Sequence, residues 1–196
     1  MINIKYKVEF FDAWHTGSGL AAGADVDALV IKDKNKLPYL PGKTIKGLVR
    51  EALEEIIQYK GINKAELVKE NFGVFEVNGK DPEETIMLRG KVFFTNAYLS
   101  KELSYAIKTD ENLYRFMYRS VSSTAIEEKT GVAKEHSLRR IQISIPCELY
   151  GEVLNVDSEL ENEIVNALGF IKRLGVGRNR GLGRCKFTVI GKEVSK

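Results

Sequence analysis

The chain begins with a strict alternation of apolar and polar residues, and this pattern constrains the fold more than any other. In residues 2–10 every second side chain is apolar, and the intervening ones are polar or charged. Successive side chains of a strand point to opposite faces, so the pattern predicts a half-buried strand. Residues 139–149 and 185–189 alternate in the same way, and residues 26–31 and 86–99 are interpreted as further strands. The chain must therefore build a sheet with one apolar face.

Two stretches have the helical period instead. Apolar residues recur at helical spacing in residues 45–57 and again in residues 160–171. The Ser-x-x-Glu spacing of Ser158 and Glu161 predicts a capping box at the start of the second helix. Strands and helices interleave, but the helices are too few for a doubly wound sheet. The order favours an α+β fold with a split β-α-β, ferredoxin-like (RRM-like) core and its helices on one face of the sheet.

The length suits one domain over residues 1–196 with two inserted excursions, near 59–85 and 101–138. A chain of this size buries a core without disulfides. Cys147 and Cys185 form no CxxC pair, so we expect a reduced, cytoplasmic protein. No apolar run approaches the roughly 20 residues of a membrane helix, so no membrane contact is expected. The two histidines and two cysteines do not have a zinc-binding spacing.

The basic charge is concentrated in one short segment. The chain has 30 Lys and Arg against 27 Asp and Glu, a net charge of +3. Residues 172–186 hold six of the basic residues and no acidic one, and the rest of the chain has a net charge of −3. The same segment contains GVGRNRGLGR at 175–184, in which glycines let the backbone approach a phosphate and arginines supply forked donors. The alternative is a solvated turn whose arginines aid solubility.

Three sequence motifs each lie next to a predicted strand or helix. HTGSG (15–19) follows the first strand, Leu-Pro-Gly-Lys (40–43) leads into the first helix, and GVGRNRGLGR precedes the last strand. Together with FFTNAYL (93–99) and EEKTGVAKEHSL (127–138), they resemble the RAMP superfamily of CRISPR-associated proteins over nearly the whole chain. Within it, the chain is most similar to the backbone subunit of type III effector complexes.

The resemblance implies a ferredoxin-like core with insertions, one of them a thumb-like hairpin. It implies that copies of the chain form a filament along a guide RNA (crRNA), together with other effector subunits. Each thumb would enter between bases of the duplex that the crRNA forms with complementary target RNA. The resemblance also implies a metal-dependent cut in the target at regular intervals.

In the family that cut depends on an aspartate just ahead of the Leu-Pro-Gly helix. The register through residues 30–33 places the matching position at Asp27, and Asp25 is the alternative because both would point to one face of a strand. One carboxylate can hold a divalent ion such as Mg²⁺, or orient the attacking ribose 2′-hydroxyl. The other interpretation of both residues is a solvated strand face.

RNA contacts are expected from a helix face, a loop and a histidine. Lys43, Lys46 and Arg50 lie at i, i+3 and i+7, and Lys43 is at the helix N-terminus, where the dipole favours anions. A solvated charged face is the alternative. His15 is a candidate acid, base or phosphate contact, or a structural residue. The loop residues expected at the RNA are Gly177, Arg178, Asn179, Arg180, Gly181, Gly183 and Arg184.

The thumb segment combines apolar and basic residues. Ile126 and Val132 are candidate wedges between bases, and Lys129 is the cation between them. Further basic residues flank the segment: Arg119, Lys134, Arg139 and Arg140. The aromatic residues are not placed as an RNA-stacking RRM sheet requires, so we expect recognition of shape and phosphates rather than base sequence.

We therefore expect a type III backbone subunit that binds crRNA and cleaves paired target RNA. Two alternatives remain open. One is a structural RNA-binding RAMP subunit without catalysis. The other is a guide-processing endoribonuclease of the same superfamily, although these enzymes usually have two fused ferredoxin-like domains and 196 residues are short for two.

Overall fold

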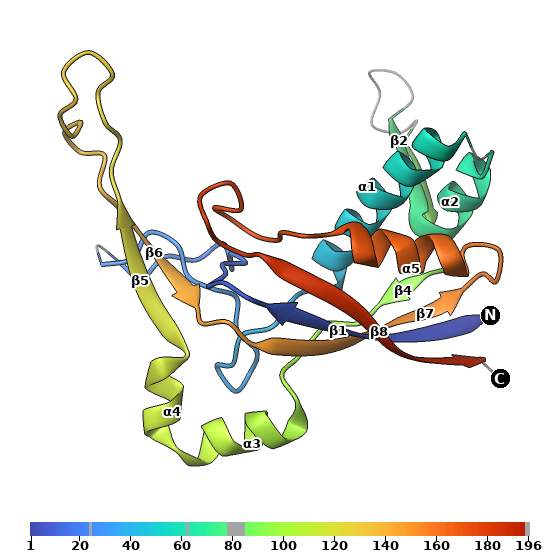
Figure 1. Cartoon of the computed structure of the whole chain (residues 1–196), viewed down its shortest axis with the longest axis horizontal. Coiled ribbons are helices and arrows are strands. Elements are labelled where there is room, and N and C mark those ends of the chain that lie inside the picture. Colours follow the sequence, from blue (N-terminus) through green and yellow to red (C-terminus); the bar gives the residue numbers. More distant parts are fainter. Residues whose placement is uncertain (24, 62, 78–84, 195–196) are drawn as a thin grey trace.

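The computed structural model describes residues 1–23, 25–61, 63–77 and 85–194 (Figure 1). Its centre is an antiparallel four-stranded sheet in the order β4-β7-β1-β8. The strands are β1 (Ile2–Phe10), β4 (Phe93–Phe94), β7 (Glu148–Val156) and β8 (Cys185–Val194). Helices α1 (Gly42–Lys60) and α5 (Glu161–Phe170) lie together on one side of this sheet (Figure 1). The structure is therefore a mixed α+β fold, as the sequence predicts.

The core lies between the helices and the apolar face of the sheet. Ile4, Tyr6 and Val8 of β1 are fully buried, which confirms the half-buried N-terminal strand. They belong to one cluster with the buried stripes of the two helices: Ile45, Val49 and Leu53 from α1, Ile164 and Leu168 from α5. Each such side chain contributes roughly 1.5–3 kcal/mol when it is fully buried. No helix among the described residues is both long and apolar enough to cross a membrane.

Two groups of elements are inserted into this core. Between α1 and β4 lie α2 (Ala65–Phe72) and a small sheet of β2 (Gly73–Val77) and β3 (Thr85–Arg89). The predicted excursion over 59–85 covers part of this group, and residues 62 and 78–84 lie outside the described residues. Between β4 and β7 lie α3 (Lys101–Thr109), α4 (Glu111–Phe116) and a hairpin of β5 (Tyr118–Ser123) and β6 (Arg139–Ser144). Figure 1 shows this hairpin extending away from the body of the molecule.

Three local predictions need correction. Residues 26–31 form isolated bridges rather than a strand. The alternating run 139–149 is divided into β6 and β7 because Pro146 has no N–H to continue a ladder. Residues 86–99 likewise contain the end of β3 and the two-residue β4.

The predicted capping box is also wrong. Helix α5 has Leu160 at its N-cap, with no hydrogen bond from the side chain of that residue. The side chain of Asp157 instead accepts a hydrogen bond from the backbone N–H of Glu159 at 3.0 Å, in the turn before the helix. The side chain of Asp157 thus orders the turn, and the N-cap lies at Leu160, two residues later than the Ser-x-x-Glu spacing suggests.

Candidate nucleic-acid interface

The glycine-rich loop and one face of the β5–β6 hairpin enclose a cleft of about 650 Å³. The hairpin contributes two directly opposed pairs, Val121 with Ile141 and Ser123 with Arg139, so all four side chains lie on one face. The loop contributes residues 175–180 and Leu182. A smaller cleft of about 430 Å³ continues toward the hairpin loop and shares Ser123, Arg139 and Arg180 with the first. We call the two clefts together the hairpin groove.

The loop is fixed at its base to the segment that follows β1. The N–H of Gly183 donates to Ala13 O and the N–H of Leu174 donates to Gly183 O, both at 2.9 Å. Gly183 has φ +71°, and a Cβ there would lie 1.9 Å from the carbonyl oxygen of Leu174. Only glycine allows this approach. The guanidinium of Arg173 donates to Arg178 O at 2.8 Å and supports the other side of the loop.

The tip of the loop presents free donors. The backbone N–H groups of Gly177, Arg178, Asn179 and Gly181 donate to no acceptor among the described residues. The Arg178 and Arg180 side chains are exposed and form no ion pair with any described side chain. Successive free N–H groups in a tight turn make an anion-binding concavity, and arginine forks suit phosphate oxygens. The groove thus combines unneutralised donors with an apolar floor.

The predicted loop residues divide into two groups. Gly177, Arg178, Asn179 and Arg180 line the groove, and Gly181 is exposed beside them. Gly183 is buried, and Arg184 lies outside the groove, where its Nε is 3.2 Å from Asp12 Oδ2 and its guanidinium lies over the ring of Phe11. Gly183 and Arg184 therefore support the base of the loop. The N–H of Gly183 is not available to a phosphate, because it already donates to Ala13 O.

Asp27 lies on the free edge of β6. Its N–H donates to Arg140 O at 2.8 Å, and the N–H of Arg140 donates to Asp27 Oδ2 at 2.6 Å. The carboxylate is exposed, and its Oδ1 accepts no hydrogen bond in the described part of the chain. Asp27 is thereby held beside Arg140, the neighbour in sequence of the groove residue Arg139, but Asp27 itself lines neither cleft; among the described residues the Asp25 carboxylate accepts no such hydrogen bond.

A divalent ion would find few protein ligands at this edge. The described residues contain no group of three or more His, Cys, Asp or Glu side chains that could hold a metal ion. Magnesium is commonly held by one or two carboxylates, with water and substrate phosphates completing the shell. The open Oδ1 of Asp27 fits that mode of binding and does not fit a closed all-protein site.

His15 is buried, with 1% of its surface exposed. Its Nδ1 lies 2.5 Å from Gln142 O, and because a carbonyl can only accept, Nδ1 carries the proton. The backbone oxygen of His15 accepts from the N–H of Val176 at 2.9 Å. The residue therefore connects β6, through its ring, to the glycine-rich loop, through its backbone oxygen, and the ring is buried, which favours the structural alternative over the expected phosphate contact.

Of the three α1 cations that were predicted to contact RNA, two form hydrogen bonds within the chain itself. Lys46 Nζ donates to Val92 O at 2.9 Å, and partial burial, followed by the nearby charge of Arg50, lowers the pKa of its amine. Arg50 donates to Gly73 O at 3.0 Å and pairs with Glu54 at 2.7 Å. These contacts attach the α2–β3 insertion to α1, so the predicted phosphate grip is not free at either residue.

The N-terminus of α1 is also largely satisfied. Asn96, in the FFTNAYL motif, accepts the N–H of Gly42 on its Oδ1 at 2.8 Å, and the N–H groups of Thr44 and Ile45 donate to Pro41 O. Lys43 remains exposed. An anion at this end would therefore meet the charge of Lys43 rather than a row of free donors.

The loop of the hairpin, residues 124–138, exposes apolar side chains. Ile126 and Val132 have 60% and 62% of their surfaces exposed, and Lys129 is exposed between them. The loop is ordered by backbone hydrogen bonds from Glu127 N to Val132 O and from Lys134 N to Ala125 O. Two apolar side chains thus stand in solvent on a supported frame.

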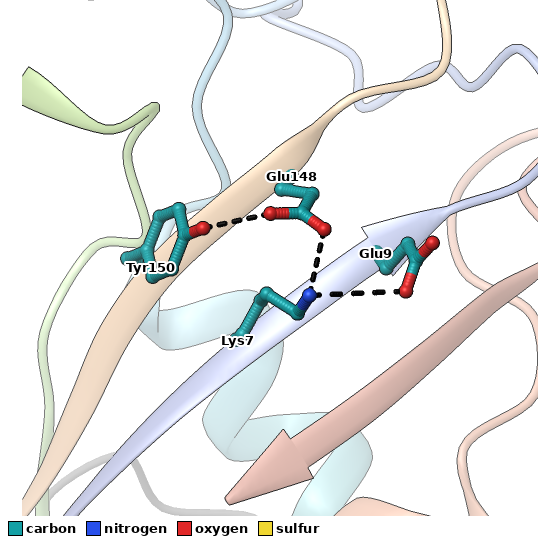
Figure 2. A network of polar contacts seen from close by, with 4 residues as sticks. All are labelled: Lys7, Glu9, Glu148 and Tyr150. Carbon is teal, nitrogen blue, oxygen red and sulfur yellow. Dashed lines mark hydrogen bonds and ion pairs between the residues drawn. The ribbon is translucent and has the colours of Figure 1, made fainter. Parts of the chain in front are cut away.

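The sheet face opposite the helices carries compensated charges. Figure 2 shows Lys7 Nζ at 2.6 Å from Glu148 and 3.9 Å from Glu9, with the Tyr150 hydroxyl donating to Glu148 at 2.7 Å. The hydrogen bond from Lys7, reinforced by that from Tyr150, lowers the pKa of Glu148. These mutually neutralised side chains leave little positive potential here, in contrast to the hairpin groove.

Comparison with known proteins identifies the family. A model of the RAMP superfamily matches residues 7–186. A chain of the Type III-B Cmr-beta bound to cognate target RNA, determined by cryo-EM, is 10% identical and superimposes with a TM-score of 0.65 over 95% of this chain and 96% of that one. A chain of Type III-B Cmr-beta in the apo state is 11% identical, with a TM-score of 0.68 over 96% and 97% of the two chains. No curated protein matches the sequence. Because the family model spans nearly all of the chain, this protein belongs to the RAMP superfamily.

Proposed function

We propose that the protein is an RNA-binding subunit of a type III CRISPR effector complex and that the hairpin groove holds the crRNA by its phosphates. The observation that supports the proposal is that Arg139, Arg178 and Arg180 line one cleft together with loop residues whose backbone N–H groups are free. Such a site binds any nucleotide sequence, because phosphates carry no sequence information. Family membership and a fold shared with chains of Cmr-beta complexes support this assignment.

We further propose a ferredoxin-like core, a thumb and a backbone role. The element order β1-α1-β4-β7-α5-β8 with the sheet order β4-β7-β1-β8 supports a split β-α-β core. The β5–β6 hairpin is the candidate thumb, and Ile126 and Val132 are the side chains available to enter between bases. In this proposal copies of the chain follow one another along the crRNA, beside other effector subunits and paired target RNA.

Target cleavage at Asp27 is the finer part of the proposal. A bound Mg²⁺ would supply charge stabilisation at the reacting phosphate. Asp27 would contribute one carboxylate oxygen to that ion, or orient the ribose 2′-hydroxyl as a hydrogen-bond acceptor. Its place at the edge of β6, hydrogen-bonded to Arg140 next to the groove residue Arg139, favours this role. The hydrogen bond from Arg140 N favours the second candidate, a structural subunit in which Asp27 only fixes the strand edge.

Salt dependence of RNA binding tests the groove. In single-stranded nucleic acid each lost phosphate contact reduces the slope of log affinity against log salt by about 0.7. The variant Arg178→Gln/Arg180→Gln should therefore flatten the slope by roughly 1.4. Lys172→Gln/Lys186→Gln is the matched control, since both lysines belong to the same basic segment but do not line the groove. Equal changes in the two variants would exclude the groove as the specific site.

The catalytic part is tested separately in the reconstituted complex, with matched target RNA and Mg²⁺. Asp27→Asn keeps an oxygen that can accept from Arg140 N, so the strand edge should persist while the charge is lost. We expect target binding to remain and cleavage to stop, whereas Asp25→Asn should cleave normally. Cleavage that continues unchanged in Asp27→Asn would establish the structural candidate instead.

A further inference from the structure

A second basic cleft lies at the opposite end of β5 from the hairpin groove. It has a volume of about 540 Å³ and forms where the turn after residue 32 meets α3 and α4. We call it the α4 cleft, and its lining residues are Asn35, Lys36, Leu37, Ile107, Lys108, Tyr114 and Arg115. None of these residues lines the hairpin groove.

The floor of the α4 cleft is apolar and firmly held. Leu37 and Ile107 each expose only 3% of their surface. The ring of Tyr114 packs edge-on against Tyr118, with 5.8 Å between the ring centroids, and the Tyr118 hydroxyl donates to Lys36 O at 2.7 Å. The hydroxyl thus ties the turn to the start of β5, and the cleft is built before any ligand arrives.

The turn itself is fixed by its first residue. Asp33 accepts hydrogen bonds on Oδ1 from the N–H of Asn35 at 2.8 Å and from the N–H of Leu37 at 2.9 Å. This use of the carboxylate removes it from the rim, and no acidic side chain that the structure describes lines the cleft. The positive side chains around it are therefore not neutralised from within.

Three cations line the cleft, and a fourth lies over the ring of Tyr118. Lys36, Lys108 and Arg115 are exposed at the rim, and Lys32 Nζ lies 4.2 Å from the centroid of the Tyr118 ring. None of the four forms an ion pair with a described side chain. Burial and then the charge of Lys36 lower the pKa of the Lys32 amine, so Lys32 and Lys36 repel each other. A bound anion would relieve that repulsion.

We propose that the α4 cleft is a second nucleic-acid contact that takes a single strand, with phosphates on Lys36, Lys108 and Arg115 and a base against Tyr114. A cationic rim around an aromatic floor is how proteins hold single strands without reading their sequence. An acidic peptide would use the rim but would leave the aromatic floor without a planar partner. On β5, the three residue steps from Tyr118, which packs against Tyr114 of the cleft, to Val121, the first groove residue, correspond to about 10 Å.

The test measures binding of a fluorescein-labelled, unstructured single-stranded RNA to the full chain by fluorescence anisotropy over a series of salt concentrations. Lys108→Gln/Arg115→Gln removes two rim charges. The control Lys34→Gln/Lys101→Gln removes two exposed charges, one from the turn that borders the cleft and one from α3, neither of which lines the cleft. Both variants are compared in the wild type and in the Arg178→Gln/Arg180→Gln background. This second background separates failure of the α4 cleft from failure of the groove.

We expect the rim variant to flatten the salt slope by roughly 1.4 in both backgrounds, and the control to leave it unchanged. Tyr114→Leu, checked for an unchanged circular dichroism spectrum, should weaken binding by roughly 5- to 150-fold at fixed salt, which is the range of one stacked base. An unchanged slope in the rim variant overturns the proposal. A second result would also overturn it: a poly-glutamate peptide binds the wild type but not the rim variant, while RNA binds both proteins equally. The cleft would then be a site for an acidic peptide.

Discussion

The substitution Gly183→Ala provides the sharpest test of how the glycine-rich loop is built. A matched control exists in the same loop, because Gly181 also has a positive φ, +85° against +71° for Gly183. A Cβ on Gly181 would meet no atom within 4 Å, whereas a Cβ on Gly183 would lie 1.9 Å from Leu174 O. Both variants thus lose stability because an alanine adopts a left-handed backbone conformation, but only in Gly183→Ala does the new Cβ collide with Leu174 O.

The magnitudes follow from these contacts. A left-handed conformation costs an alanine about 1–2 kcal/mol, so Gly181→Ala should lower the free energy of unfolding by that amount. At residue 183 the Leu174 carbonyl must in addition move by at least about 1 Å, since real Cβ contacts are essentially never below 3.0 Å. That movement disrupts the two hydrogen bonds of Gly183, with Ala13 and Leu174, each of which contributes about 0.5–1.5 kcal/mol net. Gly183→Ala should therefore cost about 1–3 kcal/mol more than Gly181→Ala.

Urea and thermal unfolding of the two variants measure this difference. For a chain of this length 1 kcal/mol corresponds to about 2–4 °C, so the Tm of Gly183→Ala should fall roughly 2–12 °C further than that of Gly181→Ala. The Gly183 variant should also bind RNA more weakly, because the loop tip moves with its base. Equal losses of stability in the two variants would refute the close approach at Leu174 as the reason for glycine at residue 183.

Three further predictions concern other parts of the molecule. Asn96→Ala should lower the free energy of unfolding by about 0.5–2 kcal/mol, because it removes the acceptor for the first N–H of α1. Asn96→Asp keeps an acceptor oxygen and should retain most of that stability. Equal urea midpoints for Asn96→Ala and the wild type would contradict this prediction. Burial raises the pKa of the Cys147 and Cys185 thiols to about 12, so at pH 8 both should react with a disulfide reagent far more slowly in the native than in the urea-unfolded protein, and similar rates would argue against their burial. The hydrogen bond from Lys7 holds the pKa of Glu148 below its ordinary value of 4.5, so the ionised carboxylate stabilises the fold above that pH and ceases to do so as the pH falls through the lower folded pKa. Glu148→Gln should therefore lose less stability than the wild type between about pH 5 and pH 3. Identical acid sensitivity of the two proteins would disprove the role of this pair.

Local periodicity predicts the core of this fold well. The alternation in residues 2–10 and the helical stripe in residues 45–57 describe β1 and most of α1, because both segments bury one face against neighbours. Residues 26–31 show why the same pattern fails elsewhere. They lie along β6 with only Asp27 and Ala28 reaching its edge, so side chains alternate without a continuous ladder. Alternation indicates which side chains are buried and does not reveal whether the backbone pairs.

The candidate site is predicted only in part, for a similar reason. The glycine-rich loop stands out in the sequence, and four of its seven residues predicted to contact RNA line the groove. The partner wall does not stand out, since Arg139 and Ile141 come from a hairpin about 40 residues away and look like ordinary strand residues. The sequence leaves His15 open between a phosphate contact and a structural residue, and only the tertiary contacts show that it is enclosed between β6 and the loop. Nothing in a linear sequence reports such an enclosure.

The position of β1 in the sheet has a consequence for how the protein is made. Its two neighbours are β7 and β8, and residues 10 and 148 are separated by about 140 positions, so the ribosome needs roughly 7–28 s to supply the first partner after it has completed β1. During that time an apolar strand with two unpaired edges waits for the C-terminal quarter of the chain. Long-range pairing of this kind slows folding and exposes the nascent chain to aggregation. Any truncation before residue 148 removes both neighbours at once, so partial translation products have no route to the native core.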